Sequence, residues 1–205
     1  MPKVSEEHKN RRREQILDGA RRCFARHGYE GATVARLEEE TGLSRGAIFN
    51  YFPSKEAIFL AVAQASSDRL TAIWLEQGFR ALLDALVLED PDWLSVQLEA
   101  VRRLRTDPDF QRQVAEHDEA DLPARRERLR HLAEQGVRDD VALESIGAFL
   151  SAVANGLALR LTVGDPLPDL DDIAELVEHG VRGGQPRRIA APHSPRPARA
   201  GSRRS

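Results

Sequence analysis

The sequence predicts an all-α protein with a small helical head and a larger helical body. Leu, Ala, Arg and Glu dominate the 205 residues, and few stretches alternate Val, Ile or Tyr with polar residues as strands do. Hydrophobic residues make up 41% of the chain, which is enough for a core, and charged residues make up 31%, which suits exposed helical faces. A chain of this length has room for two helical domains.

Two short helices around a tight turn organise the head. Thr33 is suited to cap the first of them, because its hydroxyl can accept a hydrogen bond from a free N–H group of the first turn. Gly42 tolerates the positive φ at which helices often end, and Ser44 can cap the next helix. Pro53 disfavours helical geometry at the residue before it, so we expect the second helix over residues 45–51.

This arrangement is a helix-turn-helix, whose second helix enters the major groove of DNA. The outward face of that helix offers hydroxyl, guanidinium and amide groups, with small residues that permit close approach and no carboxylate. A helical hairpin that never contacts DNA is the alternative for such a geometry. The residues predicted to contact DNA are Thr33, Arg36, Ser44, Arg45, Gly46, Ala47, Phe49, Asn50, Tyr51 and Lys55.

The helix that precedes this motif begins with Arg11, Arg12 and Arg13. We expect them to contact phosphate, which adds affinity without sequence preference; a solvated helix start is the alternative. Cys23, on the apolar stripe of the same helix, is expected to be a small core side chain.

Charge, cysteine content and targeting signals indicate which partners and which cellular compartment suit the protein. The formal net charge of −3 does not by itself indicate nucleic-acid binding, because acid in one domain can mask base in another. A single cysteine excludes an intramolecular disulfide and suits a reducing compartment. The sequence shows no signal peptide, and no apolar run approaches the about 20 residues of a membrane span. We therefore expect a cytoplasmic protein.

Six further helices are expected in the rest of the chain. Pro123 lies inside the fourth of these and is expected to kink or break it. The expected ranges are 54–75, 79–88, 93–105, 110–138, 140–161 and 170–181, with the start of the fifth at Asp139 or Asp140.

The helix over residues 140–161 is expected to form a homodimer. It is apolar on more than one face and rich in Gly, Ala and Ser, which let helix axes approach closely. We expect it to pair, together with the last helix, with the same helices of a second copy. A central core helix in a monomer is the alternative. A dimer would place two recognition helices about 34–36 Å apart on a palindromic operator.

Enzyme motifs are absent from the sequence. It contains no Gly-rich phosphate loop and no HExxH or CxxC spacing, and its six histidines are scattered. We therefore expect no catalytic activity and no required cofactor. The stretch 183–205 contains Gly, Pro, Ser, Ala and Arg with no acid, so a disordered basic tail is expected; nonspecific DNA contact by its arginines is the alternative.

The head resembles the DNA-binding domain of the TetR family of bacterial repressors. The matching residues are Gly42-Leu43-Ser44, Phe49-Asn50-Tyr51-Phe52 and Pro53-Ser54-Lys55-Glu56. Three departures stand out: Phe49 replaces a usual Tyr, Tyr51 replaces a usual His, and Glu38 occupies a position where a small residue is common. The resemblance implies a DNA-binding domain over residues 10–70, with the helix-turn-helix over 33–52, and a ligand-binding and dimerisation domain over 71–182.

Two longer segments are similar to the aconitase repressor subgroup of that family, ARRCFARHGYEGATVARLEEETGLSRGAIFNYFPSKEAIFLA and WLSVQLEAVRRLRTDPDF. This similarity implies a repressor of an aconitase gene whose effector is citrate held with Mg²⁺. By position it implies Arg128 and Glu178 as ligand contacts and Glu178 as the metal contact; an ordinary surface charge is the alternative for each. Two other functions remain open: a TetR repressor of an unrelated neighbouring gene with another ligand, and a helical interaction module whose head is vestigial.

Overall fold

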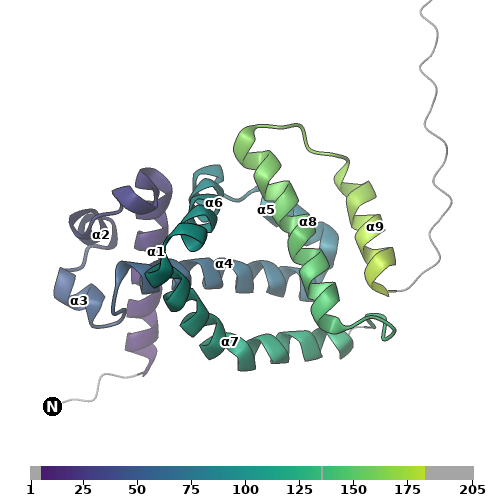
Figure 1. The fold of residues 1–205 in the computed structure, drawn as a ribbon, viewed down its shortest axis with the longest axis horizontal. Helices are drawn as coiled ribbons and strands as arrows, with labels where there is room; N and C mark the ends of the chain where they lie inside the picture. Colours follow the sequence, from purple (N-terminus) through teal and green to yellow (C-terminus); the bar gives the residue numbers. More distant parts are fainter. Residues whose placement is uncertain (1–5, 135, 183–205) are drawn as a thin grey trace, which may run out of the picture.

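The computed structural model describes residues 6–134 and 136–182, apart from the side chains of Arg125, Arg128, Leu129 and Leu132. Every regular element in these ranges is a helix, which confirms the all-α class (Figure 1). The expected basic tail over 183–205 lies outside the described residues. The helices are α1 (Glu6–Gly31), α2 (Val34–Thr41), α3 (Arg45–Phe49), α4 (Lys55–Gln77), α5 (Phe79–Val87), α6 (Pro91–Thr106), α7 (Pro108–Glu134), α8 (Leu143–Val163) and α9 (Leu170–Arg182).

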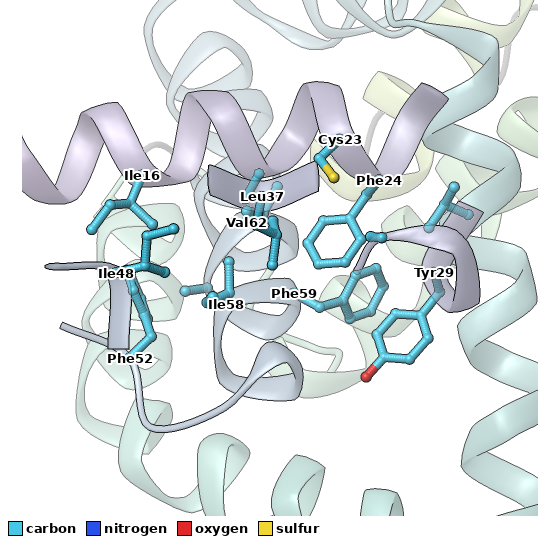
Figure 2. Close-up of a cluster of buried hydrophobic side chains, with 14 of the residues drawn as sticks. Ile16, Cys23, Phe24, Tyr29, Leu37, Ile48, Phe52, Ile58, Phe59 and Val62 are labelled. Carbon is cyan, nitrogen blue, oxygen red and sulfur yellow. The ribbon is translucent and has the colours of Figure 1, made fainter. Parts of the chain in front are cut away.

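Helices α1, α2 and α3 and the first half of α4 surround one hydrophobic cluster (Figure 2). The ring of Phe24 stacks on Tyr29 with centroids 5.9 Å apart, and both rings meet the edge of Phe59, at 5.4 Å and 5.2 Å. Trp93 of α6 and Phe110 of α7 complete the same cluster, so two body helices contribute to the core of the head. The position of the head therefore depends on how α6 and α7 pack.

A second cluster holds the body together. It contains buried residues of α5, α6, α8 and α9, with Phe79 and Leu83 of α5 among the least exposed. In Figure 1, α8 and α9 lie at the end of the molecule away from α2 and α3. The helix α4 runs between the two ends, and its residues contribute to both clusters. A shift at the body end of α4 is thus able to move the head.

The largest departures from the expected helix ranges lie around the connection of α7 to α8. The helix α7 continues through Pro123, so the proline does not end it, and the helix changes direction along its length (Figure 1). It ends at Glu134, and α8 begins at Leu143 rather than at Asp139 or Asp140. The reason is a local clamp: the Asp140 carboxylate is bound by Arg138 and so does not cap the start of a helix. Arg138 donates two hydrogen bonds of 2.6 Å to the Asp140 carboxylate, and the Arg138 N–H donates to the Val181 carbonyl at 2.9 Å.

The helix α8 is apolar but mostly exposed. Its length and composition are those of a helix able to span a membrane, and only 17% of the apolar window is buried. The expectation that no apolar run approaches this length was therefore wrong. Three large apolar side chains of α8 are about half exposed or more, as is one of α9: Phe149, Leu159, Val163 and Leu176. An apolar face of this size is typical of an interaction surface.

Candidate nucleic-acid interface and body cavity

The caps expected from the sequence set the geometry of the helix-turn-helix. The Thr33 hydroxyl accepts a hydrogen bond from the Arg36 N–H at 3.4 Å, and the Ser44 hydroxyl accepts one from the Ala47 N–H at 3.4 Å. Gly42 ends α2 with a φ of 69°, a left-handed conformation that glycine adopts without strain. These three residues fix where α2 stops and where α3 starts.

Sequence reasoning missed the role of Glu38 in this turn. Its carboxylate accepts a hydrogen bond of 2.6 Å from the Arg45 N–H, the first free donor of α3. A carboxylate at a helix start is favoured by the helix dipole. Glu38, which occupies a position where a small residue is common in the family, is thus a second cap of the recognition helix.

The recognition helix is shorter than expected. It ends at Phe49, Asn50 is its C-cap, and Tyr51 lies in the following turn, so the expected range 45–51 was two residues too long. The cause lies at Ile48, whose carbonyl accepts from the N–H groups of Asn50, Tyr51 and Phe52 and closes the last turn tightly.

Four of the ten residues predicted to contact DNA are exposed on or beside α3. Ser44, Arg45, Gly46 and Asn50 are exposed, whereas Ala47, Phe49 and Tyr51 are half-buried. The Arg45 guanidinium lies 5.8 Å from the centroid of the Phe49 ring, and Phe49 packs against the core of the head. The Phe49 ring therefore packs against the Arg45 guanidinium and helps to hold it in place. A Cβ atom added at Gly46 would meet no heavy atom within 4 Å, so the helix surface there is open to an approaching backbone.

Two of the predicted DNA contacts also hold the head together. Arg36 donates to the Gly31 carbonyl at 2.7 Å. Lys55 donates to the Tyr29 carbonyl at 3.0 Å, and its amino group lies 4.4 Å from the Tyr29 ring centroid. These side chains fix the joints of α1 with α2 and with α4, and a role toward phosphate would come in addition.

Tyr29 links the head to the body helices. Its hydroxyl donates to Glu56 at 2.8 Å, and Arg103 of α6 lies 4.6 Å above its ring and 3.7 Å from the Glu56 carboxylate. Burial, followed by the hydrogen bond to Glu56, raises the pKa of Tyr29. Burial acts to raise the pKa of Glu56 as well, but hydrogen bonds from its own N–H, Tyr29 and Ser54 outweigh it and lower that pKa.

The body contains a partly open cavity of about 430 Å³ between α4, α5, α6, α7 and α8. This volume falls in the range of small-molecule sites. Leu70, Trp74 and Phe79 form part of its apolar wall. The polar wall contains carboxylates and hydroxyl or amide side chains, among them Ser66, Glu89, Gln97, Asp118, Asp121, Glu144 and Asn155.

The structure uses Glu178 in packing. One carboxylate oxygen accepts from the Phe79 N–H at 3.2 Å, at the start of α5, and the other accepts from the Arg182 guanidinium at 2.6 Å. Residues 6–134 and 136–182 contain no group of three or more His, Cys, Asp or Glu side chains placed to hold a metal. A contact of Glu178 with a Mg²⁺ ion that citrate also binds stays a prediction, since it needs only one protein carboxylate. Arg128 lies in α7, and its side chain is outside the described part of the structure.

Cys23 is fully buried, as the sequence predicted. Burial raises the pKa of its thiol to about 11, so the nucleophilic thiolate is scarce near neutral pH.

Comparison with known proteins agrees with this geometry. Residues 16–62 match the family model of bacterial regulatory proteins of the tetR family, and residues 68–185 match the C-terminal model of BetI-type transcriptional repressors. The chain is 45% identical over 185 residues to the HTH-type transcriptional repressor Rv1474c of Mycobacterium tuberculosis, covering 89% of this chain and 99% of the relative. The chain belongs to the TetR family.

Further TetR proteins support the same assignment. The HTH-type transcriptional repressor AcnR of Corynebacterium diphtheriae is 43% identical over 189 residues, covering 91% of this chain and all of the relative. The solved structure of Salmonella enterica GusR, 19% identical, has a TM-score of 0.59 and covers 88% of this chain and all of the other, which shows a shared fold. We therefore describe the protein as a TetR-type, DNA-binding transcriptional repressor.

Proposed function

We propose that this TetR protein represses an aconitase gene in the cytoplasm, binds a palindromic operator as a dimer, and responds to citrate with Mg²⁺. The observation that carries the proposal is the match to repressors named AcnR along both head and body. It reaches 43% identity over 91% of the chain in the relative from Corynebacterium diphtheriae. Ligand bodies diverge faster than DNA-binding heads in this family, so a match through the body supports a shared target and effector.

The exposed apolar faces of α8 and α9 support the dimer. Phe149 and Leu159 of α8 and Leu176 of α9 are 46%, 49% and 55% exposed. A Cβ at Gly156 would meet nothing within 4 Å, so a second helix has room to approach the backbone of α8 there. A second copy would cover these residues and pair the two heads for a palindrome.

The body cavity supports a small effector, and citrate is the effector that the resemblance to the aconitase repressors implies. A guanidinium binds a carboxylate through two parallel hydrogen bonds, so Arg128 on α7 is the cation that we assign to citrate. Because both oxygens of Glu178 are engaged by Phe79 and Arg182, we assign Glu178 to the joint of α5 with α9. Each oxygen keeps a second lone pair, so we assign the Mg²⁺ contact to Glu178 as well.

A fluorescence anisotropy titration tests the proposal. Labelled DNA from upstream of an aconitase gene is titrated at fixed salt against the protein, alongside random DNA, with citrate and Mg²⁺ together and separately. The proposal requires tight binding to the aconitase probe that changes only when citrate and Mg²⁺ are both present. Binding that ignores citrate leaves a TetR repressor with another ligand. Absence of salt-dependent binding to any DNA by a folded dimer favours the interaction module.

A further inference from the structure

A buried carboxylate lies where the head, the long helix α4 and the cavity meet. Glu89 follows α5, and its side chain is only 2% exposed. It forms ion pairs with Arg21 of α1 and Arg69 of α4. We call Arg21, Glu89 and Arg69 the Glu89 triad. A charge this deeply buried is costly unless it is paired, so the three side chains constrain one another's positions.

The Glu89 triad is continuous with the packing of the head. Arg21 also donates to the Ser66 hydroxyl of α4 at 3.4 Å, and its guanidinium lies 5.7 Å from the centroid of the Trp93 ring. Trp93 is fully buried and belongs to the core cluster of the head. Burial lowers the pKa of Arg21, and its side chain is 29% exposed. A displacement of Glu89 would therefore be felt by α1, α4 and α6 together.

Glu89 and Ser66 also line the body cavity. The same carboxylate thus faces the cavity on one side and α1 on the other. The DNA-contacting motif follows directly from α1, with α2 packed on it so closely that a Cβ at Gly19 would lie 2.7 Å from the Thr41 Cα atom. A rotation of α1 is therefore transmitted to α2.

We propose that Glu89 is the positioning residue that couples the cavity to the DNA-binding head through its ion pair with Arg21. This inference rests on the proposed function, in which an effector occupies the cavity. A molecule that fills the cavity displaces the Glu89 carboxylate, and Arg21 follows it because the ion pair joins the two side chains. Since α1 carries Arg21, the angle between the head and α4 changes, and the spacing of the two heads in the dimer changes with it.

The test fills the cavity with a side chain rather than a ligand. Ala154 and Thr71 are half-buried residues of the cavity wall, so Ala154→Phe and Thr71→Phe each place a ring inside it. Arg21→Met removes the link to α1 while leaving Glu89 paired with Arg69. The aconitase-probe Kd is measured for wild type, Ala154→Phe, Arg21→Met and the double variant. We expect Ala154→Phe to change the Kd of the otherwise wild-type protein by about tenfold. In the Arg21→Met background, the same substitution should change the Kd by no more than about twofold.

Two controls separate coupling from stability. Arg21→Lys keeps the charge and should restore the response to Ala154→Phe. Asp171→Asn breaks a different interhelical ion pair, the 2.6 Å contact of Arg80 with Asp171 between α5 and α9, and should leave the response intact. All titrations are made well below each variant's Tm, so the folded fraction is constant. A merely structural Arg21 would lower the Tm and leave the response to Ala154→Phe unchanged.

Hydrogen exchange gives a readout that does not need DNA. We expect Ala154→Phe to change the protection of amides in α1 and α2 in the wild-type background and to leave it unchanged with Arg21→Met. If the response persists with Arg21→Met in either measurement, the coupling is wrong. It is also wrong if neither Ala154→Phe nor Thr71→Phe, both folded, changes head protection. If Ala154→Phe changes amide protection in the head but the protein binds no aconitase probe, the proposed function is wrong. The coupling between the cavity and the head is then still supported.

Discussion

At the scale of single residues, Gly46 occupies a helical position of α3 that alanine would fill better. Replacing glycine by alanine inside a helix stabilises it by about 0.5–1 kcal/mol. The added Cβ of Gly46→Ala meets no atom of the protein within 4 Å, so the variant should unfold at a higher urea concentration. It should also bind the operator more weakly, because the methyl group separates α3 from the DNA. Urea unfolding checks the expected gain in stability, and anisotropy checks the expected loss of operator affinity. Undiminished binding would show that DNA does not approach Gly46.

Arg45 and Lys55 are expected to contribute to DNA binding in different ways. Arg45 is exposed on α3, so Arg45→Ala should cost about 1–3 kcal/mol on the operator and relax its base preference. Lys55→Ala should weaken binding to every sequence and reduce the salt dependence. Because Lys55 also holds the Tyr29 carbonyl, its variant should lose stability as well.

Anisotropy on operator and random DNA across a salt series, with urea unfolding alongside, separates these effects. An equal loss on both DNAs for Arg45→Ala would remove Arg45 from the base-reading residues.

The roles of several residues of the head were predictable because they depend only on local chemistry. The caps Thr33, Ser44 and Gly42 were read from residue type and spacing, because a cap depends only on its neighbours within one turn. The bond from the Arg45 N–H to Glu38 was not predictable, because it crosses the turn and depends on the angle between α2 and α3.

At the scale of helices, the crossing of α1 over α2 depends on a glycine. A Cβ at Gly19 would lie 2.7 Å from the Thr41 Cα and 2.8 Å from the Glu40 carbonyl oxygen, both backbone atoms that cannot move aside. Gly19→Ala should therefore push α2 off α1 and destabilise the protein by about 1–3 kcal/mol. Urea unfolding measures this loss. Gly46→Ala is the matched control with the opposite expected sign, and a stabilised Gly19→Ala would show that the two helices tolerate separation.

The contacts of Tyr29 with Glu56 and Arg103 should make the packing of the head sensitive to acid. The pKa of Glu56 is lowered in the folded protein, so its contribution to stability is complete above its unfolded pKa, near 4.5, and is lost as the pH falls through the folded value. The Phe110 N–H and Arg103 lower the pKa of Asp107 in the same direction. Urea unfolding between pH 6 and 3 should show this loss, and Glu56→Gln should make the curve shallower. A variant with the same pH dependence as wild type would exclude Glu56 as a source.

Helix starts were predictable where a side-chain cap marks them, as at Thr33 and Ser44, whereas the boundaries expected next to prolines in α3, α6 and α7 were each two residues off. The start of α8 was misplaced because Asp140, a good helix start by composition, is bound by Arg138. That clamp includes a bond from Arg138 to Val181, which lies 43 positions further along the chain, so no local pattern reports it. Pro123 was expected to kink or break its helix, and the helix continues through it without a break.

At the scale of the whole molecule, two clusters share the helices that connect them. Trp93 of α6 belongs to the core of the head, whereas Leu94, the next residue, belongs to that of the body. The sequence predicted head and body as separate units, and it gave no sign of the cavity or of the buried Glu89. Both arise from contacts between helices distant in sequence, such as Arg21 with Glu89. The periodicity of each helix reports which face is apolar but not which partner it meets.

Helix periodicity also does not report which apolar faces meet a second copy of the chain, whereas the structure supports a dimer through α8 and α9. Phe149 and Leu176 are exposed on α8 and α9, outside the core of a single copy. The double variant Phe149→Arg/Leu176→Arg should place charges in the dimer interface without disturbing the protomer. We expect a monomer by light scattering, near-unchanged helicity, and a loss of operator affinity of about a hundredfold or more, because each head then binds a half-site alone.

Val101→Arg is the matched control for that variant, since Val101 is 62% exposed on α6 and belongs to neither hydrophobic cluster. It adds the same kind of charge to an apolar surface position and should leave both the dimer and operator binding intact. If the double variant stays dimeric, α8 and α9 are not the interface. If it becomes monomeric yet keeps full operator affinity, the paired heads do not act together on DNA, and the palindromic operator loses its physical basis.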